Sequence, residues 1–145
     1  MKKKVIFALI LNIVFCAGCG SSILKVFSKG FTELNAEQSV EMLKNEKDIL
    51  VIDVSSEKEV VKKPAHITGS IWIPEDQLPA RINEIAVYKD KKVICVCPCG
   101  KRSRRVSGVL AKNGFKHVYN ISAGVPGLVK VPGAPIDYTQ RKIDR

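Results

Sequence analysis

The feature that most constrains the fold of this chain is an alternation between short apolar runs and segments of helical periodicity. The apolar runs lie at residues 49–52, 71–73, 93–96 and 117–119. Each has the length and composition of a strand buried on both faces of a sheet. The helical segments lie at residues 36–43, 78–85 and 103–113. Strands and helices that alternate in this way predict a single α/β domain, with a mostly parallel central sheet of about five strands and helices on both faces.

Length and composition agree with one globular domain. The chain has 145 residues, of which 46% are hydrophobic and 26% are charged, which suffices for one core. The 24 Lys and Arg residues exceed the 14 Asp and Glu residues, so the net charge is +10. Aromatic residues make up only 6% and do not interleave with the basic residues, as they would on a single-strand binding surface. We therefore expect no nucleic-acid partner.

The amino terminus has the pattern of an export signal. Lysines at positions 2–4 precede an apolar run at 5–15, which is shorter than the roughly 20 residues of a spanning helix. Small residues then lead into Cys19, which Gly-Ser-Ser follows, and this stretch resembles the cleavage site of bacterial lipoprotein signal peptides. The resemblance implies a signal peptide at residues 1–18, a lipid on Cys19 and a tether at residues 19–30.

The resemblance further implies an exported protein, anchored through its lipid to a membrane of the cell envelope on the periplasmic side. Simple signal-peptidase cleavage and an uncleaved anchor are the alternatives. Export would place Cys95, Cys97 and Cys99 in an oxidising compartment, where exposed thiols tend to pair. Three thiols within five residues therefore call for a functional explanation.

The loop after the apolar run at 93–96 is where the fold predicts chemistry, because ligands bind beyond the carboxyl ends of parallel strands. It reads Cys97-Pro-Cys-Gly-Lys-Arg-Ser103. Backbone N–H groups and the helix dipole give the start of the following helix a positive potential. A thiol placed there is stabilised as a thiolate. The sequence therefore predicts Cys97 as a nucleophile that is activated electrostatically, without a histidine base. The basic residues that add to the potential are Lys101, Arg102, Arg104 and Arg105.

This loop resembles the Cys-x-x-Gly-x-Arg-Ser active loop of rhodanese-like domains. Further stretches resemble the motifs of that family in the same order, at residues 52–54 with Glu59, 66–74, and 114–125. The resemblance covers residues 31–138, and we place a rhodanese-like domain at residues 31–140. The segment from Cys97 to Arg102 has six residues, the length found in sulfurtransferases, whereas phosphatase-like members have a loop one residue longer.

The resemblance implies a sulfurtransferase. Such an enzyme moves a sulfane sulfur from a small anionic donor, thiosulfate-like or polysulfide, to a thiol or cyanide acceptor, here through a persulfide on Cys97. The residues that it implies for binding the donor and stabilising the persulfide are Cys99, Gly100, Lys101, Arg102 and Ser103. It implies no organic cofactor and no metal.

The other cysteines leave alternatives open. Cys95 lies inside an apolar run and is expected to be an inert core residue. Cys99 is a candidate resolving thiol, which would attack the Cys97 persulfide or form a strained Cys97–Cys99 disulfide. The alternative function is therefore a non-catalytic anion-binding module or a thiol–disulfide redox module. A metal site is not expected, because the spacing lacks Cys-x-x-Cys pairs and the chain has only 2 histidines.

Three other residues in the family's motifs have structural interpretations. Asp53 ends an apolar run and is expected to cap a backbone turn. His66 is generally structural in the family, and we interpret it so here. Ser55 stands where the family usually has Arg, so we expect an internal ion pair common to these domains to be missing.

Overall fold

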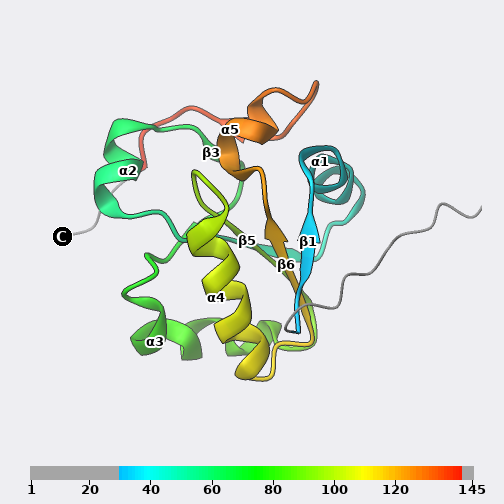
Figure 1. Ribbon diagram of the computed structural model, residues 1–145, viewed down its shortest axis with the longest axis vertical. Helices are drawn as coiled ribbons and strands as arrows, with labels where there is room; N and C mark the ends of the chain where they lie inside the picture. The colour runs from blue at the N-terminus through cyan, green and yellow to red at the C-terminus, as the bar shows by residue number, and fades with distance from the viewer. Residues whose placement is uncertain (1–29, 142–145) are drawn as a thin grey trace, which may run out of the picture.

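A five-stranded parallel sheet runs through the middle of the protein (Figure 1). The structure is a computed structural model, and it describes residues 30–141. The strands of the sheet are β1 (Thr32–Leu34), β2 (Ile49–Asp53), β4 (Ile71–Trp72), β5 (Lys92–Val96) and β6 (His117–Ile121). They are arranged in the order β1-β6-β5-β2-β4, and every neighbouring pair is parallel. The predicted α/β domain with a parallel sheet is confirmed.

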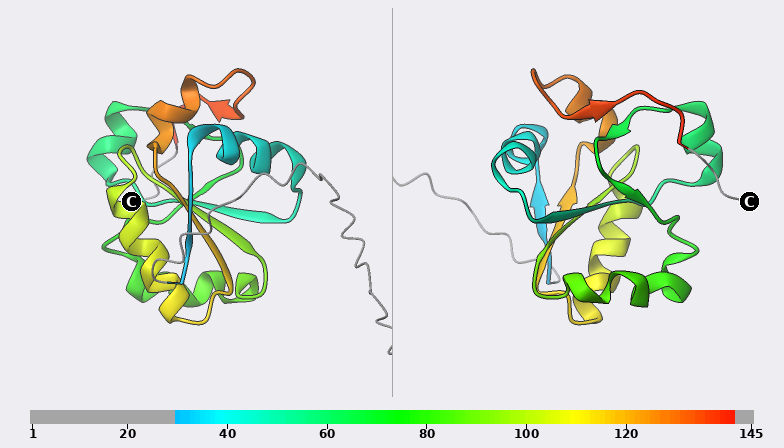
Figure 2. Two further views of the ribbon diagram at one scale, coloured as in Figure 1. Left: turned by 45° about the vertical axis from the view of Figure 1, so that its right-hand side comes forward. Right: turned by 180° about the vertical axis from the view of Figure 1, so that it is seen from behind.

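Helices cover both faces of this sheet (Figure 2). The helices on one face are α1 (Ala36–Asn45) and α5 (Gly124–Val129). Those on the other face are α3 (Leu78–Arg81), the 3₁₀ helix η1 (Ile82–Tyr88) and α4 (Lys101–Lys112). Near the carboxyl ends of the strands lie α2 (Glu57–Lys62) and an antiparallel ribbon of β3 (His66–Ile67) and β7 (Ile136–Asp137). In the range 30–141 no helix is both long enough and apolar enough to cross a membrane.

Alternation along the central strand β5 divides its side chains between two cores. Val93 and Cys95 belong to the core beneath α4, whereas Ile94 and Val96 belong to the core beneath α1 and α5. Because both faces are buried, the strand appears in the sequence as a continuous apolar run. Cys97 continues the alternation one step past the strand and therefore lies in the core beneath α4.

Some elements differ from those that the sequence predicts. The single helical stripe expected at 78–85 is instead divided between α3 and η1, with Leu78 and Ile85 buried in the same core. The short elements β1, α2, β3, α5 and β7 are not predicted, because two to six residues carry too little periodicity to recognise. The predicted signal peptide and Cys19 lie outside the described residues.

Candidate functional site

Two glycines let the Cys97 loop pack closely against the turn that follows β6. Gly100 precedes α4 with a φ of 72°, and a Cβ atom there would lie 2.3 Å from the carbonyl oxygen of Ser122. Gly124 has a φ of 61°, and its Cβ would lie 2.3 Å from the carbonyl oxygen of Pro98. Only glycine satisfies both the left-handed backbone and the close approach. The shape of the loop therefore depends on one glycine inside it and one outside it.

The Cys97 thiol lies against the first turn of α4 and is 0% exposed. The backbone N–H of Ser103 donates to Sγ over 3.4 Å, and the Ser103 hydroxyl oxygen is 3.3 Å from the same sulfur. The first N–H groups of a helix have no partner within the helix, so an anion on this sulfur meets free donors and the positive end of the dipole. The hydrogen bond observed comes from Ser103; a contribution from the amides between Cys99 and Arg102 stays a prediction.

Arg102 forms an ion pair with Glu59, which belongs to α2. Its guanidinium donates two hydrogen bonds to the carboxylate, one of them from Nη2 over 3.0 Å, and its Nε lies 3.8 Å from Glu75. These bonds from Arg102 hold the pKa of Glu59 well below its usual range, at about 2. Glu59 therefore stays ionised at neutral pH and holds the arginine beside the loop.

The other arginines of the basic cluster are paired as well. Arg104 lies 3.0 Å from a carboxylate oxygen of Glu33, and Arg105 lies 2.7 Å from one of Glu75. Lys101 is exposed and makes no ion pair with any residue that the structure describes. Carboxylates therefore balance most of the positive charge that the sequence predicts at this loop.

The three cysteines of the described chain, Cys95, Cys97 and Cys99, lie in different environments, and all three are free thiols. Cys95 is completely buried in β5, and this burial raises the pKa of its thiol to about 12, so it is an inert core residue as predicted. Cys99 is exposed. The described part of the chain contains no group of three or more His, Cys, Asp or Glu side chains that could hold a metal ion.

Asp53 has a buried arginine partner that the sequence does not predict. One carboxylate oxygen accepts hydrogen bonds from the backbone N–H of Ser55 over 3.0 Å and from its hydroxyl over 2.5 Å, which is the predicted turn cap. The other oxygen lies 3.3 Å from Nη2 of Arg141. Ser55 supplies no cation here, and the cation beside Asp53 comes from an arginine 88 residues further along the chain. No local pattern links the two positions.

Two further side chains hold the segments around β3 and β4. The His66 ring donates from Nδ1 to the carbonyl of Pro64 over 2.7 Å. Trp72 donates from Nε1 to the carbonyl of Ser55 over 2.8 Å. Both bonds end on backbone oxygens, which fits the structural interpretation of His66.

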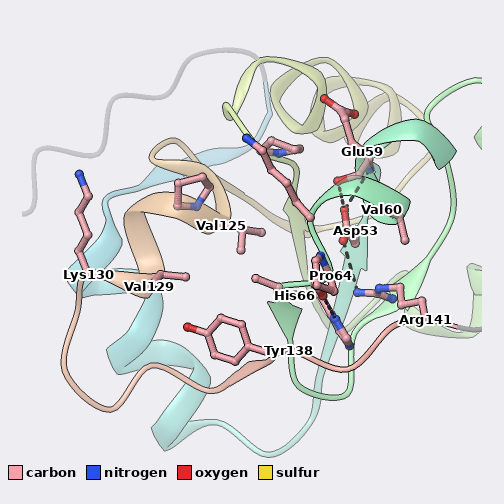
Figure 3. Close-up of a pocket in the computed structure, with 15 residues that line it drawn as sticks. Asp53, Glu59, Val60, Pro64, His66, Val125, Val129, Lys130, Tyr138 and Arg141 are labelled. Carbon is pink, nitrogen blue, oxygen red and sulfur yellow. Dashed lines mark hydrogen bonds and ion pairs between the residues drawn. The ribbon is translucent and has the colours of Figure 1, made fainter.

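A cavity of about 360 Å³ lies beside the Cys97 loop (Figure 3). It is open to solvent and lies between α2, α5 and the segment that ends at Arg141. Pro98 and Glu59 contribute to its wall, whereas Cys97 does not. Its apolar lining residues include Val60, Ala65, Val125, Val129 and Tyr138. The sequence gives no sign of this cavity, because its walls come from four separate segments.

Comparison with known proteins decides the family. The sequence profile of the rhodanese-like domain matches residues 35–130, which is more than half of the chain. The chain belongs to the rhodanese-like domain family. The profile spans both the Cys97 loop and the Asp53 strand, so the resemblance noted in the sequence is confirmed at the level of the domain.

Curated relatives share this rhodanese-like domain within longer proteins. The tRNA uridine(34) hydroxylase of Photorhabdus laumondii is 33% identical over 102 residues, which cover 68% of this chain and 28% of that protein. The protein of the same name from Hamiltonella defensa is 31% identical over 96 residues, which cover 63% and 26% of the two chains. The chain therefore spans about a quarter of the length of these relatives.

Solved structures share the fold. A rhodanese-related protein from Thermoplasma volcanium is 25% identical, with a TM-score of 0.60, over 74% of this chain and 98% of that one. A rhodanese-like domain protein from Staphylococcus aureus is 24% identical, with a TM-score of 0.59, over 70% and 94% of the two chains. A thiosulfate sulfurtransferase from Pseudomonas aeruginosa, 16% identical over 66% and 18% of the chains with a TM-score of 0.54, shares the fold alone.

Proposed function

We propose that this rhodanese-like domain is a sulfurtransferase that carries a sulfane sulfur on Cys97. The donor is a small anion, thiosulfate-like or polysulfide, and the acceptor is a thiol or cyanide. The observation that carries the proposal is the position of the Cys97 sulfur at the amino-terminal end of α4, where Ser103 donates a hydrogen bond to it. That position stabilises an anion on sulfur without needing a second titratable group.

In the first step the Cys97 thiolate attacks the outer sulfur of thiosulfate. A new S–S bond forms to Cys97 while the S–S bond of the donor breaks, and sulfite leaves with the electron pair. The product is a persulfide anion, which has the same charge as the thiolate before it. The same hydrogen-bond donors therefore serve both states of the enzyme.

In the second step the acceptor attacks the terminal sulfur of the persulfide. Its electron pair forms the new bond, and the pair of the broken S–S bond returns to Cys97 as the thiolate. Cyanide leaves as thiocyanate, and a thiolate acceptor leaves as its own persulfide. The cycle consumes no external oxidant or reductant.

The donor reaches Cys97 only after the side chains over its sulfur move, because the residue is fully buried. We place this movement at Arg102, which lies beside Ser103 in the first turn of α4. Arg102 and its partner Glu59 are 27% and 30% exposed, so the pair is open to solvent and to competing anions. An ion pair of this exposure contributes about 1 kcal/mol or less, which an anionic donor can displace.

The curated relatives are named as hydroxylases, and we do not propose that activity for this chain. The match to the Photorhabdus protein covers 28% of that protein, and only the domain is shared. Attachment to the cell envelope through a lipid on Cys19 is a separate proposal that rests on the sequence pattern. Metabolic labelling with a fatty acid tests it: label on the wild type and none on Cys19→Ala supports the lipid, whereas equal label contradicts it.

The test of sulfur transfer is the initial rate of thiocyanate formation from thiosulfate or polysulfide and cyanide. We expect Cys97→Ser to lower the rate by about a hundredfold or more, since it removes the nucleophile. Cys95→Ala is the matched control, because that thiol lies in the same core but is not at the helix terminus, and it should keep most of the activity. A wild type that is inactive with both donors, or a Cys97→Ser variant as active as the wild type, would contradict the proposal.

A further inference from the structure

We propose that the cavity beside the Cys97 loop binds a small amphipathic monoanion, a free carboxylate with an apolar chain. This site goes beyond the proposed sulfur transfer. Its wall contains neither Cys97 nor residues Cys99 to Ser103, although Pro98 and Glu59 make it a neighbour of the loop.

The size and lining of the cavity suit an apolar chain. Its volume of about 360 Å³ falls within the range of small-molecule sites. Figure 3 shows the side chains of Val125, Val129 and Tyr138 around one common space. Two of these hydrophobic residues are open to water, with Val129 43% and Tyr138 62% exposed. A bound apolar chain would cover this surface and remove it from water.

The charges around the cavity favour an anion. The basic lining residues are Lys63, Lys130 and Arg141, and the acidic ones are Asp53 and Glu59. Both acidic groups are already paired, Asp53 with Arg141 and Glu59 with Arg102. Lys63 and Lys130 make no ion pair with any residue between 30 and 141. The two lysines therefore leave a surplus of positive charge at the cavity, which the charge of a bound carboxylate would reduce.

A buried hydrogen-bond donor without a partner also favours an anion in this cavity. The Nε atom of Arg141 is buried and has no hydrogen-bond partner in the described chain, although the other guanidinium nitrogens bond to Asp53 and Ser70. The Arg141 side chain is only 10% exposed, and it lines the cavity. Buried polar groups in folded proteins almost always have partners, and a carboxylate oxygen would supply this one. The same burial lowers the pKa of Arg141, so a further anion nearby would stabilise its charged form.

Octanoate is the probe that tests the site, because it joins an eight-carbon chain to one negative charge. Titration of the full chain, followed by backbone amide chemical shifts, should show saturable changes at residues of α2, α5 and the segment 136–141. We expect a Kd of about 1 mM or tighter for a ligand of this size. Octylamine has the same chain with the opposite charge and should cause no saturable change at these residues.

Two matched pairs of variants locate the binding. Val129→Glu places a carboxylate at the cavity, whereas Val109→Glu places one on α4, away from the cavity. The two valines are matched in exposure, at 43% for Val129 and 40% for Val109. The first should weaken octanoate binding about tenfold or more, and the second should leave it unchanged within about twofold. Lys130→Gln should weaken binding severalfold, whereas Lys112→Gln, an exposed lysine at the end of α4, should not.

The proposal is overturned if octanoate causes no saturable change at about 10 mM, a concentration well above the expected Kd. It is also overturned if octylamine binds equally well, or if Val129→Glu and Val109→Glu bind octanoate alike. Urea unfolding of both valine variants checks that each is folded. Cys97→Ser should bind octanoate like the wild type, so failure of this site and failure of sulfur transfer are measured separately.

Discussion

Replacement of Arg141 by methionine should destabilise the domain by about 3 kcal/mol. Arg141 and Asp53 are 10% and 4% exposed at their side chains, so the pair is almost fully removed from water. Methionine keeps most of the length of the side chain but leaves the Asp53 carboxylate without its cation. It also removes the hydrogen bonds from Arg141 to Ser70, at 2.6 Å and 3.1 Å. Loss of one partner from a buried ion pair is costly because the other charge stays buried.

The measurement is urea unfolding at pH 7. With a slope of about 2 kcal/mol per molar, a loss of about 3 kcal/mol lowers the midpoint by about 1.5 M. Lys116→Met is the matched control, because Lys116 and Asp90 form a pair whose side chains are 68% and 74% exposed. That exposed pair should contribute less than about 1 kcal/mol.

A double-mutant cycle with Asp53→Asn isolates the ion pair from other effects of the substitution. Asparagine keeps an oxygen for the turn at Ser55 but removes the charge. We expect a coupling energy of about 1.5 kcal/mol or more between positions 53 and 141. A loss below about 1 kcal/mol for Arg141→Met, or a coupling energy near zero, would refute the assignment of a stabilising buried pair.

Three more predictions concern the loop and its surroundings. Gly124→Ala should lower the stability of the fold by about 2–4 kcal/mol and reduce turnover, because the new Cβ would lie 2.3 Å from the carbonyl oxygen of Pro98. Gly114→Ala is the control, because Gly114 also has a positive φ, of 87°, but a Cβ there would meet no atom within 4 Å. It should lower stability by only about 1 kcal/mol and leave turnover intact. Equal losses of stability and turnover in the two glycine variants would contradict the close contact at Gly124. Glu59→Gln should destabilise by about 1 kcal/mol at neutral pH. Because the folded-state pKa is lowered from 4.5 to about 2, that difference should be full above pH 4.5 and shrink as the pH falls toward 2. A pH-independent difference would argue against the pair. Cys99→Ser should keep thiocyanate formation, and if it also leaves transfer to thiols and the response to oxidants untouched, Cys99 is not a resolving thiol.

The sequence predicts the centre of the sheet because its physical signal is local. Burial on both faces makes β2 and β5 continuous apolar runs, and Cys97 follows directly from the end of β5. The edge strand β1, with three residues, and the two-residue strands β3 and β7 leave no such signal. They form because neighbouring segments offer hydrogen-bond partners, which only the tertiary structure reveals.

The surroundings of the site could not be predicted for the same reason. The sequence shows the basic residues of the loop side by side, but their carboxylate partners Glu33, Glu59 and Glu75 come from three distant segments. Arg141 reaches Asp53 from the far end of the described chain, 88 residues away in the sequence. The identity of the nucleophile is a local property of the sequence, whereas the balance of charge around it is not.

The most direct test of the central claim is the intact mass of the protein before and after incubation with thiosulfate, for the wild type and for Cys97→Ser. We predict a gain of about one sulfur mass on the reduced wild type alone, which cyanide then removes. A wild type that gains no sulfur, or a Cys97→Ser variant that gains it equally, would contradict the persulfide on Cys97. A loss of two protons on mild oxidation without any sulfur gain would instead support the Cys97–Cys99 redox alternative.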